Sequence, residues 1–384
     1  MSLAAAAFAT AFPGLSVEEA FALREGRAWR HFAGNDPARF APLLAVADLD
    51  AHLRTDAARS PRVSMADEAR EGSAGVPEHE FTLPDGRVDL PRLLGRFDAG
   101  ASLVVSQFHE THPPLQRFCR GLEKLFLHAV QANIYLTPPG AQGFRTHYDT
   151  HDVLVLQLEG AKRWRVWDGE RVERPTRRTP WPGAMEPLGE PHLLVLQPGD
   201  ALYIPRGVMH DAATQGERSL HVTVGLLEAS WAQAIRLLVD AAELDDAALR
   251  ESVPSWRIGE ADLAPALAAK LARLSGPAQA ERLANLLLEG LARDRQPLPG
   301  RGLFAPLPAG PLALADGMHH LLARAPDGSA TLHWAGGALP LDAAQAAEVE
   351  RLAEGAEPAD AALAERLWRL GLLEPLDAPP ATAP

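Results

Sequence analysis

The stretch NIYLTPPGAQGFRTHYDTHDVLVLQLEGAKRWRVW, residues 133–167, decides the fold of this 384-residue chain. It carries a His-Tyr-Asp triplet, followed by a strongly apolar run, VLVLQL (153–158), and then by a glycine and an aromatic run. In an extended strand, side chains two residues apart point to the same face, so His147 and Asp149 can reach one point together. Two histidines and one carboxylate on one side of a metal, with its other positions open, are typical of non-haem Fe(II) sites.

The third ligand of such a site must come from another part of the chain. His151 has the right parity, but along a flat strand it would lie roughly 13 Å from His147, too far to share one ion. The favoured candidate is His210, at the end of LQPGDALYIPRGVMH (196–210), where Pro-Gly-Asp indicates a turn and Pro-Arg-Gly ends a short strand. The runner-up is His221, in SLHVTVGL. A lone His-x-Asp occurs by chance in many chains, so the prediction depends on the turn and on the histidine that follows it.

Residues 133–167 together with 196–224 resemble the JmjC-type oxygenases of the cupin superfamily, and among them the ribosomal oxygenases, which hydroxylate ribosomal proteins. The matching pieces are NIYLTPPGAQG, HYD, LQLEGAKRWR and PGDALYIPRGVMH. Strong similarity covers residues 85–240, and beyond them only the order of the domains matches. The resemblance implies a mainly β catalytic core, the double-stranded β-helix or JmjC/cupin jelly roll. It also implies Fe(II) as cofactor, 2-oxoglutarate as co-substrate and O2 as oxidant.

The resemblance assigns roles to individual residues. Carried over, His147, Asp149 and His210 are the iron ligands. Lys162 becomes the cation that pairs with the distal carboxylate of 2-oxoglutarate, a role that a lysine on an inner strand can fill through a charge-assisted hydrogen bond. From the residues alone, a surface position beside a turn is the simpler interpretation of this lysine. The remaining candidates, which also fit ordinary strand residues, are Asn133, Tyr135 and Thr223 at the co-substrate or substrate pocket, and Gln107 and Tyr148 at the substrate.

The composition narrows the class of protein. The net charge of −13 argues against broad, unspecific binding to nucleic acids, which needs a basic surface. An acidic enzyme suits a cationic substrate through electrostatic steering, although acidity also keeps a protein in solution. The single cysteine, Cys119, excludes an internal disulfide and a cysteine-based zinc site, and it fits a reducing compartment. No run of 18 apolar residues is present, so we expect a cytoplasmic protein without a membrane span.

The first predicted domain comprises residues 1–228. It begins with helices that support the catalytic core. From residue 131 onward, short strands with Pro and Gly between them predict an all-β barrel or jelly roll. Within this domain, the basic and Pro-rich insertion 168–191 is interpreted either as a rim of the substrate mouth or as a solvated loop.

Two further regions are predicted after the catalytic domain. Residues 229–296 have the Ala/Leu periodicity of helices, and the resemblance makes them a homodimerisation region. The alternative is that they pack only on their own barrel. The resemblance makes residues 297–384 a small winged-helix-like domain. Because this segment carries few basic residues, we expect it to contact protein rather than DNA. The tail DAPPATAP, 377–384, is predicted to be disordered.

Together these features predict an Fe(II)- and 2-oxoglutarate-dependent oxygenase that hydroxylates a His or Arg side chain of a ribosomal protein. Hydroxylation of a peptide natural product and demethylation of N-methyl-lysine are alternatives within the oxygenase class. A cupin that holds a metal without redox chemistry is an alternative from another class, against which Lys162 and the long resemblance argue. A non-catalytic scaffold is another, against which the intact set of candidate ligands argues.

Overall fold

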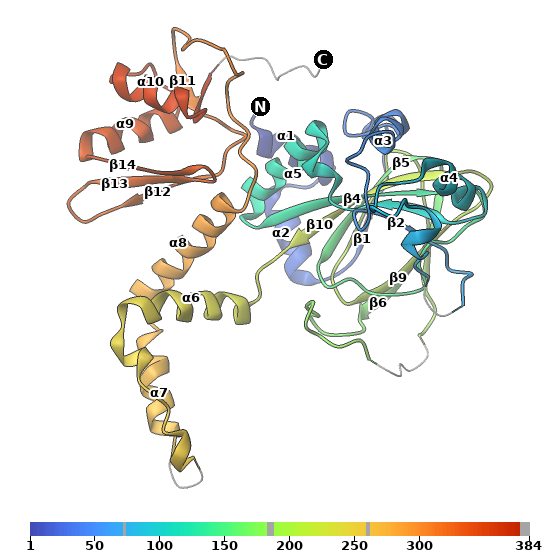
Figure 1. Ribbon diagram of the computed structural model, residues 1–384, viewed down its shortest axis with the longest axis horizontal. Helices are drawn as coiled ribbons and strands as arrows, with labels where there is room; N and C mark the ends of the chain where they lie inside the picture. The colour runs from blue at the N-terminus through green and yellow to red at the C-terminus, as the bar shows by residue number, and fades with distance from the viewer. Residues whose placement is uncertain (72–73, 183–187, 259–261, 377–384) are drawn as a thin grey trace. The chain divides into compact units, whose positions relative to one another are not determined.

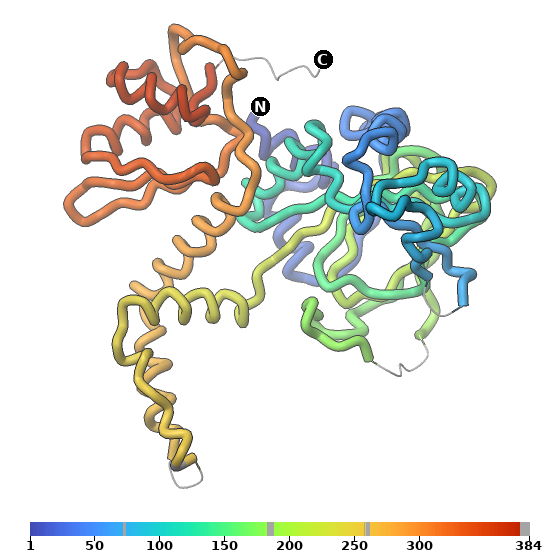
Figure 2. The backbone as a smooth tube through the Cα atoms, viewed as in Figure 1, coloured from blue at the N-terminus to red at the C-terminus, as the bar shows by residue number. Residues whose placement is uncertain are grey.

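The computed structural model describes residues 1–71, 74–182, 188–258 and 262–376 of the chain. It consists of two compact units, Met1–Glu228 and Ala229–Pro384. Figure 1 labels their helices and strands, and Figure 2 traces the backbone from blue at the N-terminus to red at the C-terminus. The tail 377–384, for which disorder is predicted, lies outside the described residues.

The first unit is built on two antiparallel sheets. The larger sheet has the strand order β1-β8-β5-β10-β4-β3-β2, and the smaller sheet has the order β7-β6-β9. The strands of the larger sheet are β1 (Arg30–Phe32), β2 (Val63–Ala66), β3 (Ser102–Val105), β4 (Ala129–Thr137), β5 (Asp152–Glu159), β8 (Ala201–Ile204) and β10 (Ser219–Leu227). Those of the smaller sheet are β6 (Lys162–Glu170), β7 (His192–Leu196) and β9 (Val208–Thr214). Apolar side chains of both sheets share one buried cluster, so the predicted mainly β jelly roll is confirmed.

Strand β5 shows how one strand serves both sides of the larger sheet. Seven of its eight residues are buried. Leu154 and Leu156 join the large core that includes the N-terminal helices, whereas Val153 and Val155 face the smaller sheet. Both faces of β5 are therefore covered, and this explains why its sequence is a continuous apolar run rather than an alternation of apolar and polar residues.

Helices pack against the leucine-bearing face of the larger sheet (Figure 1). They are α1 (Leu3–Ala11), α2 (Val17–Gly26), α3 (Val46–Leu53), α4 (Leu90–Asp98) and α5 (Pro113–Phe126). Helix α2 begins with a capping box, in which Ser16 and Glu19 accept each other's backbone N–H groups. Phe12, directly after α1, and Leu115 of α5 are almost fully buried in the same core as the β5 leucines. These helices leave the space between the two sheets free for a site.

The second unit combines helices with two small antiparallel sheets. Its helices and strands are α6 (Trp231–Asp245), α7 (Ala264–Arg273), α8 (Pro277–Arg293), β11 (Leu312–Leu314), β12 (His320–Arg324), β13 (Ala330–Trp334), β14 (Gly337–Leu341), α9 (Ala343–Ala353), α10 (Ala361–Arg369) and β15 (Leu373–Pro375). Helix α8 packs against α6 and also against β12 and β13. The regions 229–296 and 297–384, which are separate domains in the sequence analysis, therefore form one compact unit. The winged-helix assignment stays a prediction. Among the described helices, none is both long and apolar enough to cross a membrane.

Candidate active site

One backbone pairing brings the predicted metal ligands together. The N–H of His147 donates to the carbonyl of His210 at 3.0 Å, and the N–H of His210 donates to the carbonyl of His147 at 2.8 Å. The N–H of Gly207 donates to the carbonyl of Asp149 at 3.0 Å. The segment around His147 is thus held against β9 by an isolated bridge and is not the regular strand that the sequence analysis assumes. Because directly opposed residues point to the same face, this bridge sets the two histidine side chains side by side.

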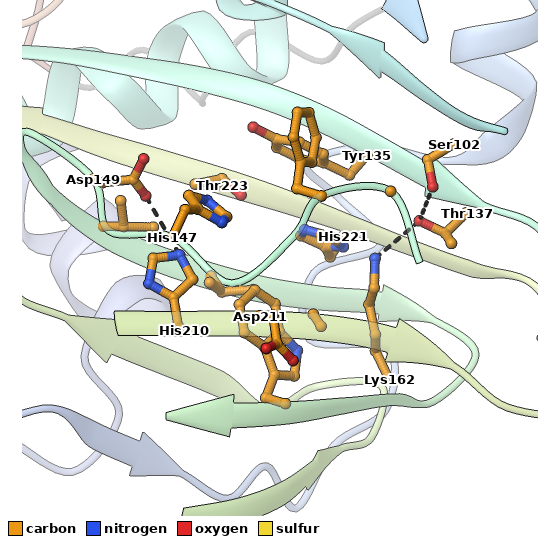
Figure 3. Close-up of a pocket in the computed structure, with 16 residues that line it drawn as sticks. Ser102, Tyr135, Thr137, His147, Asp149, Lys162, His210, Asp211, His221 and Thr223 are labelled. Atoms are coloured by element: carbon orange, nitrogen blue, oxygen red, sulfur yellow. Dashed lines mark hydrogen bonds and ion pairs between the residues drawn. The ribbon is translucent and has the colours of Figure 1, made fainter. Parts of the chain in front are cut away.

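The three side chains form a cluster that can hold a metal ion. Ligand atoms of His147, Asp149 and His210 all lie within 4.8 Å of one another. Nε2 of His210 lies 3.6 Å from a carboxylate oxygen of Asp149, and the centroids of the two imidazole rings are 4.6 Å apart. Figure 3 shows the three side chains converging at one end of the pocket.

Hydrogen bonds fix which ring nitrogen faces the cluster. Nδ1 of His147 lies 2.7 Å from the carbonyl of Arg145, and Nδ1 of His210 lies 3.1 Å from the carbonyl of Val208. A ring N–H must donate in both contacts, which leaves each Nε2 with a free lone pair. Burial, together with His147, lowers the pKa of His210 to about 4, so this ring is neutral at pH 7. Two imidazoles and one carboxylate fit a divalent metal with open positions, as in non-haem Fe(II) sites.

A cavity of about 250 Å³ lies between the two sheets and extends from the ligand cluster to Lys162 (Figure 3). Its walls come mainly from β4, β5, β6, β9 and β10. The lining residues are Ser102, Tyr135, Thr137, Gly143, Phe144, His147, Asp149, Val153, Val155, Lys162, Trp164, His210, Asp211, Ala212, His221 and Thr223. A space of this size holds a small dicarboxylic acid rather than a peptide side chain with its backbone.

Lys162 is a buried cation at the far end of this cavity. Only 4% of its surface is exposed, and its Nζ donates to Oγ1 of Thr137 at 2.9 Å. Ser102 donates in turn to the same Thr137 oxygen at 3.1 Å. Burial lowers the pKa of Lys162 to about 7, and no carboxylate of the described residues pairs with it. Because a buried charge needs a counter-ion, this lysine is suited to a carboxylate that arrives with a ligand.

His221, the runner-up for the third ligand, takes a different place. It lies beside Lys162 and outside the ligand cluster. Its ring stacks on Tyr135, with centroids 4.9 Å apart and planes 2° apart, and meets Trp164 edge-on at 5.6 Å. Nδ1 of His221 and Nε1 of Trp164 are buried without a hydrogen-bond partner. The cavity walls therefore carry polar groups whose partners the described protein does not supply.

Tyr148 and His151 are not in the cavity wall. Tyr148 lies between two ligands, so its side chain points the other way and packs with Trp167 and Met209. His151 lies over Gly225, where an added Cβ would come within 2.6 Å of its Nε2. Tyr148 also stacks on Trp181, with ring centroids 4.6 Å apart, and its contact with a substrate stays a prediction.

Asn133 and Gln107 are also outside the wall. Oδ1 of Asn133 accepts the backbone N–H of Gln107 at 2.9 Å, so these residues fasten the end of β3 to β4. Tyr135 and Thr223, by contrast, line the cavity, and their contacts with a co-substrate or substrate stay predictions. Thr137 was missed, although it follows Asn133 and Tyr135 at intervals of two along β4. Strand alternation alone would have pointed to it.

A charged strap joins the residues next to the two histidine ligands. Thr146 donates to Oδ2 of Asp211 at 2.6 Å, and Arg165 donates to both carboxylate oxygens of Asp211 at 2.8 Å. Thr146 precedes His147, and Asp211 follows His210. Asp211 is buried, and its side chain has 3% of its surface exposed. The strap therefore ties together the two segments that carry the ligands.

Part of the chain that includes this site is similar in sequence to known proteins. Residues 104–234 match the JmjC domain. The chain is 34% identical over 206 residues to the "Bifunctional lysine-specific demethylase and histidyl-hydroxylase NO66" of Aedes aegypti. The matched residues make up 53% of this chain and 32% of that protein. The protein of the same name from Drosophila persimilis is 39% identical over 147 residues, or 37% of this chain and 20% of that protein. The chain thus matches a third or less of the length of these relatives.

Solved structures share the fold over nearly the whole chain. A crystal structure of Escherichia coli YcfD has a TM-score of 0.56 at 17% identity and covers 94% of this chain and 98% of that chain. A structure of the same protein, described as a ribosomal oxygenase in complex with cobalt and 2-oxoglutarate, has a TM-score of 0.51 at 16% identity and covers 90% and 94%. At this level of identity the likeness shows the fold.

Proposed function

We propose that this chain, whose residues 104–234 match the JmjC domain and whose fold is shared with YcfD, is an Fe(II)- and 2-oxoglutarate-dependent oxygenase that hydroxylates a side chain of a ribosomal protein. The proposal depends on the two ends of one cavity. At one end lies the cluster of two histidines and one carboxylate. At the other end lies the buried Lys162, which pairs with no carboxylate among the described residues. A dicarboxylic 2-oxo acid has a metal-chelating end and a distal carboxylate, and it matches both ends.

Different residues of the cavity would bind the metal, bind the co-substrate and exclude water. His147, Asp149 and His210 would hold the metal through Nε2 and carboxylate oxygens, leaving its remaining positions open. When bound, Fe(II) with 2-oxoglutarate and O2 would supply the oxidation of a C–H bond, with 2-oxoglutarate converted to succinate and CO2. Lys162 would bind the distal carboxylate, and Val153 and Val155 would help to keep the cavity dry.

The substrate is inferred from the relatives. The NO66 proteins are named histidyl-hydroxylases, and YcfD is described as a ribosomal oxygenase. We therefore infer a histidine or arginine side chain of a ribosomal protein as the substrate. The acidic surface, with a net charge of −13, supports a basic protein as the partner through electrostatic steering. A cytoplasmic location, where such a protein would be met, agrees with the single cysteine of the chain.

Mass spectrometry tests the substrate. Ribosomal proteins incubated with the enzyme, Fe(II) and 2-oxoglutarate should gain the mass of one oxygen atom on one peptide, and His210→Ala should abolish the gain. The relatives' names also include lysine demethylation, so loss of a methyl group from N-methyl-lysine would point to that reaction instead. Turnover of 2-oxoglutarate with no change in any ribosomal protein, but with oxygen added to a small peptide, would replace the ribosomal substrate.

We further propose that the chain is a homodimer through the helices of its second unit. Helix α7 has no buried residue among its ten, all of which the structure describes. Leu267 and Leu271, one turn apart on this helix, are 59% and 54% exposed, and on α6 Trp231 and Ile235 are 77% and 49% exposed. Apolar side chains at this spacing on a helix are suited to a partner helix.

A further inference from the structure

His221 is held rigidly in the cavity wall, although the predicted co-substrate residues do not include it. It lies on β10 opposite Tyr135 of β4, and only 3% of its surface is exposed. One face of its ring stacks on Tyr135, and Trp164 meets it edge-on. Figure 3 shows the ring next to the end of the Lys162 side chain, at the part of the cavity away from Asp149. Its orientation is therefore set by aromatic packing rather than by a hydrogen bond.

The surroundings of the ring also indicate where its proton lies. Burial, together with Lys162, holds the pKa of His221 well below its ordinary value, so the ring is neutral and carries one N–H. Nδ1 is shut off from solvent and has no hydrogen-bond partner. Since orphaned buried N–H groups are rarer than under-satisfied acceptors, the proton belongs on Nε2. Because His221 lines the cavity and Nδ1, unlike Nε2, is among the buried atoms without a partner, we infer that the Nε2 edge faces the ligand space.

A carboxylate at Lys162 has more acceptor capacity than the lysine fills. Its two oxygens offer about four lone-pair sites, and Lys162 already gives one of its three N–H bonds to Thr137. We propose that His221 donates from Nε2 to the distal carboxylate of 2-oxoglutarate, beside Lys162, and so selects dicarboxylic over monocarboxylic 2-oxo acids. This inference rests on the proposed function of the site.

A neutral donor suits this position better than a second cation. A second positive charge in the same buried space would repel Lys162 and disfavour its protonated form. The imidazole N–H adds a directional hydrogen bond without that repulsion. Because the ring is fixed between Tyr135 and Trp164, its N–H can bond only to a carboxylate in one position. The flexible lysine, in contrast, recognises mainly the negative charge of the carboxylate.

Binding measurements without turnover test the role of His221. The protein is loaded with Mn(II) under exclusion of O2 and titrated calorimetrically with 2-oxoglutarate and with 2-oxopentanoate, which has a methyl group in place of the distal carboxylate. His221→Phe keeps an aromatic ring in the stack but removes the N–H. It should raise the Kd for 2-oxoglutarate about tenfold or more, the effect of one hydrogen bond to a charged group, and leave the Kd for 2-oxopentanoate unchanged.

Other outcomes separate this inference from its premise. Equal 2-oxoglutarate binding by the wild type and His221→Phe, or equal weakening for both acids, would overturn the role of His221 and leave the proposed function intact. If the wild type with metal binds no 2-oxoglutarate, the proposed function itself fails. Should His221→Phe not fold or not bind Mn(II), the pair His221→Gln and His221→Met, similar in length with and without N–H donors, decides by the same comparison.

Discussion

At the scale of single residues, Lys162 links the chemistry of the site to pH. Burial lowers its pKa to about 7, so roughly half of the molecules carry a charged lysine at pH 7 before any ligand binds. The sequence could identify this lysine only through the family resemblance, because nothing in AKRWR states which face of β6 is buried. The cluster of candidate metal ligands could be predicted from spacing and turn signals. The positions of Thr137 and His221 beside Lys162 were not predicted, because the contacts of these residues depend on how the two sheets face each other.

The pH dependence of co-substrate binding follows from this pKa. Both carboxylates of 2-oxoglutarate stay ionised above pH 6, so the charged form of Lys162 is the binding form. As pH rises through about 7 this form is lost, and the affinity of the metal-loaded protein should fall by up to about tenfold per pH unit. Titration calorimetry between pH 6.5 and 9 measures this affinity for 2-oxoglutarate. Lys162→Arg, whose guanidinium stays protonated, should show a flat profile, and a flat profile in the wild type would contradict the lowered pKa.

At the scale of secondary structure, the decisive element is the pairing of the ligand segment with β9. The apolar run 153–158 and the turn residues around 201–204 predict the strands β5 and β8 closely. They do not predict that His147 and His210 would bridge directly, because the segment around His147 is not a regular strand and its partner is distant in sequence. The strap of Thr146, Asp211 and Arg165 supports that bridge from the neighbouring positions.

Removal of the strap should weaken metal binding without unfolding the chain. Thr146→Val keeps the size of the side chain but loses the hydrogen bond to Asp211. Outer partners of metal ligands typically contribute 10–100-fold to metal affinity, so we expect about tenfold weaker Co(II) binding, followed by the electronic absorption of the bound ion. Thr146→Ser keeps the hydroxyl and should bind Co(II) nearly as the wild type does. Unchanged affinity in Thr146→Val would show that the bridge needs no such support.

At the scale of the whole molecule, the chain consists of two compact units with different tasks. The first encloses the site, and the second carries helices with exposed apolar side chains. Helical periodicity made the region 229–296 predictable from sequence. The packing of α8 on β12 and β13 could not be predicted from sequence, because the hydrophobic pattern of one segment does not indicate which other segment it contacts.

The proposed dimer can be tested at α7. Leu267→Asp combined with Leu271→Asp puts charges on its exposed apolar face, where they would be buried in a dimer. Light scattering coupled to size-exclusion chromatography should give twice the chain mass of 41.2 kDa for the wild type and the single mass for the variant. Leu193→Asp on β7, at a leucine with 68% exposure in the other unit, is the matched control and should stay dimeric. A monomeric wild type would contradict the proposal.

Conversion of 2-oxoglutarate to succinate and CO2 by the purified protein distinguishes an oxygenase from a cupin without redox chemistry. Release of labelled CO2 from 2-oxoglutarate should require both Fe(II) and O2. It should be lost in Asp149→Ala and His210→Ala, whose side chains belong to the ligand cluster. Iron-loaded wild-type protein that binds no 2-oxoglutarate and releases no CO2, even with ribosomal proteins present, would contradict the account and favour a cupin without redox chemistry.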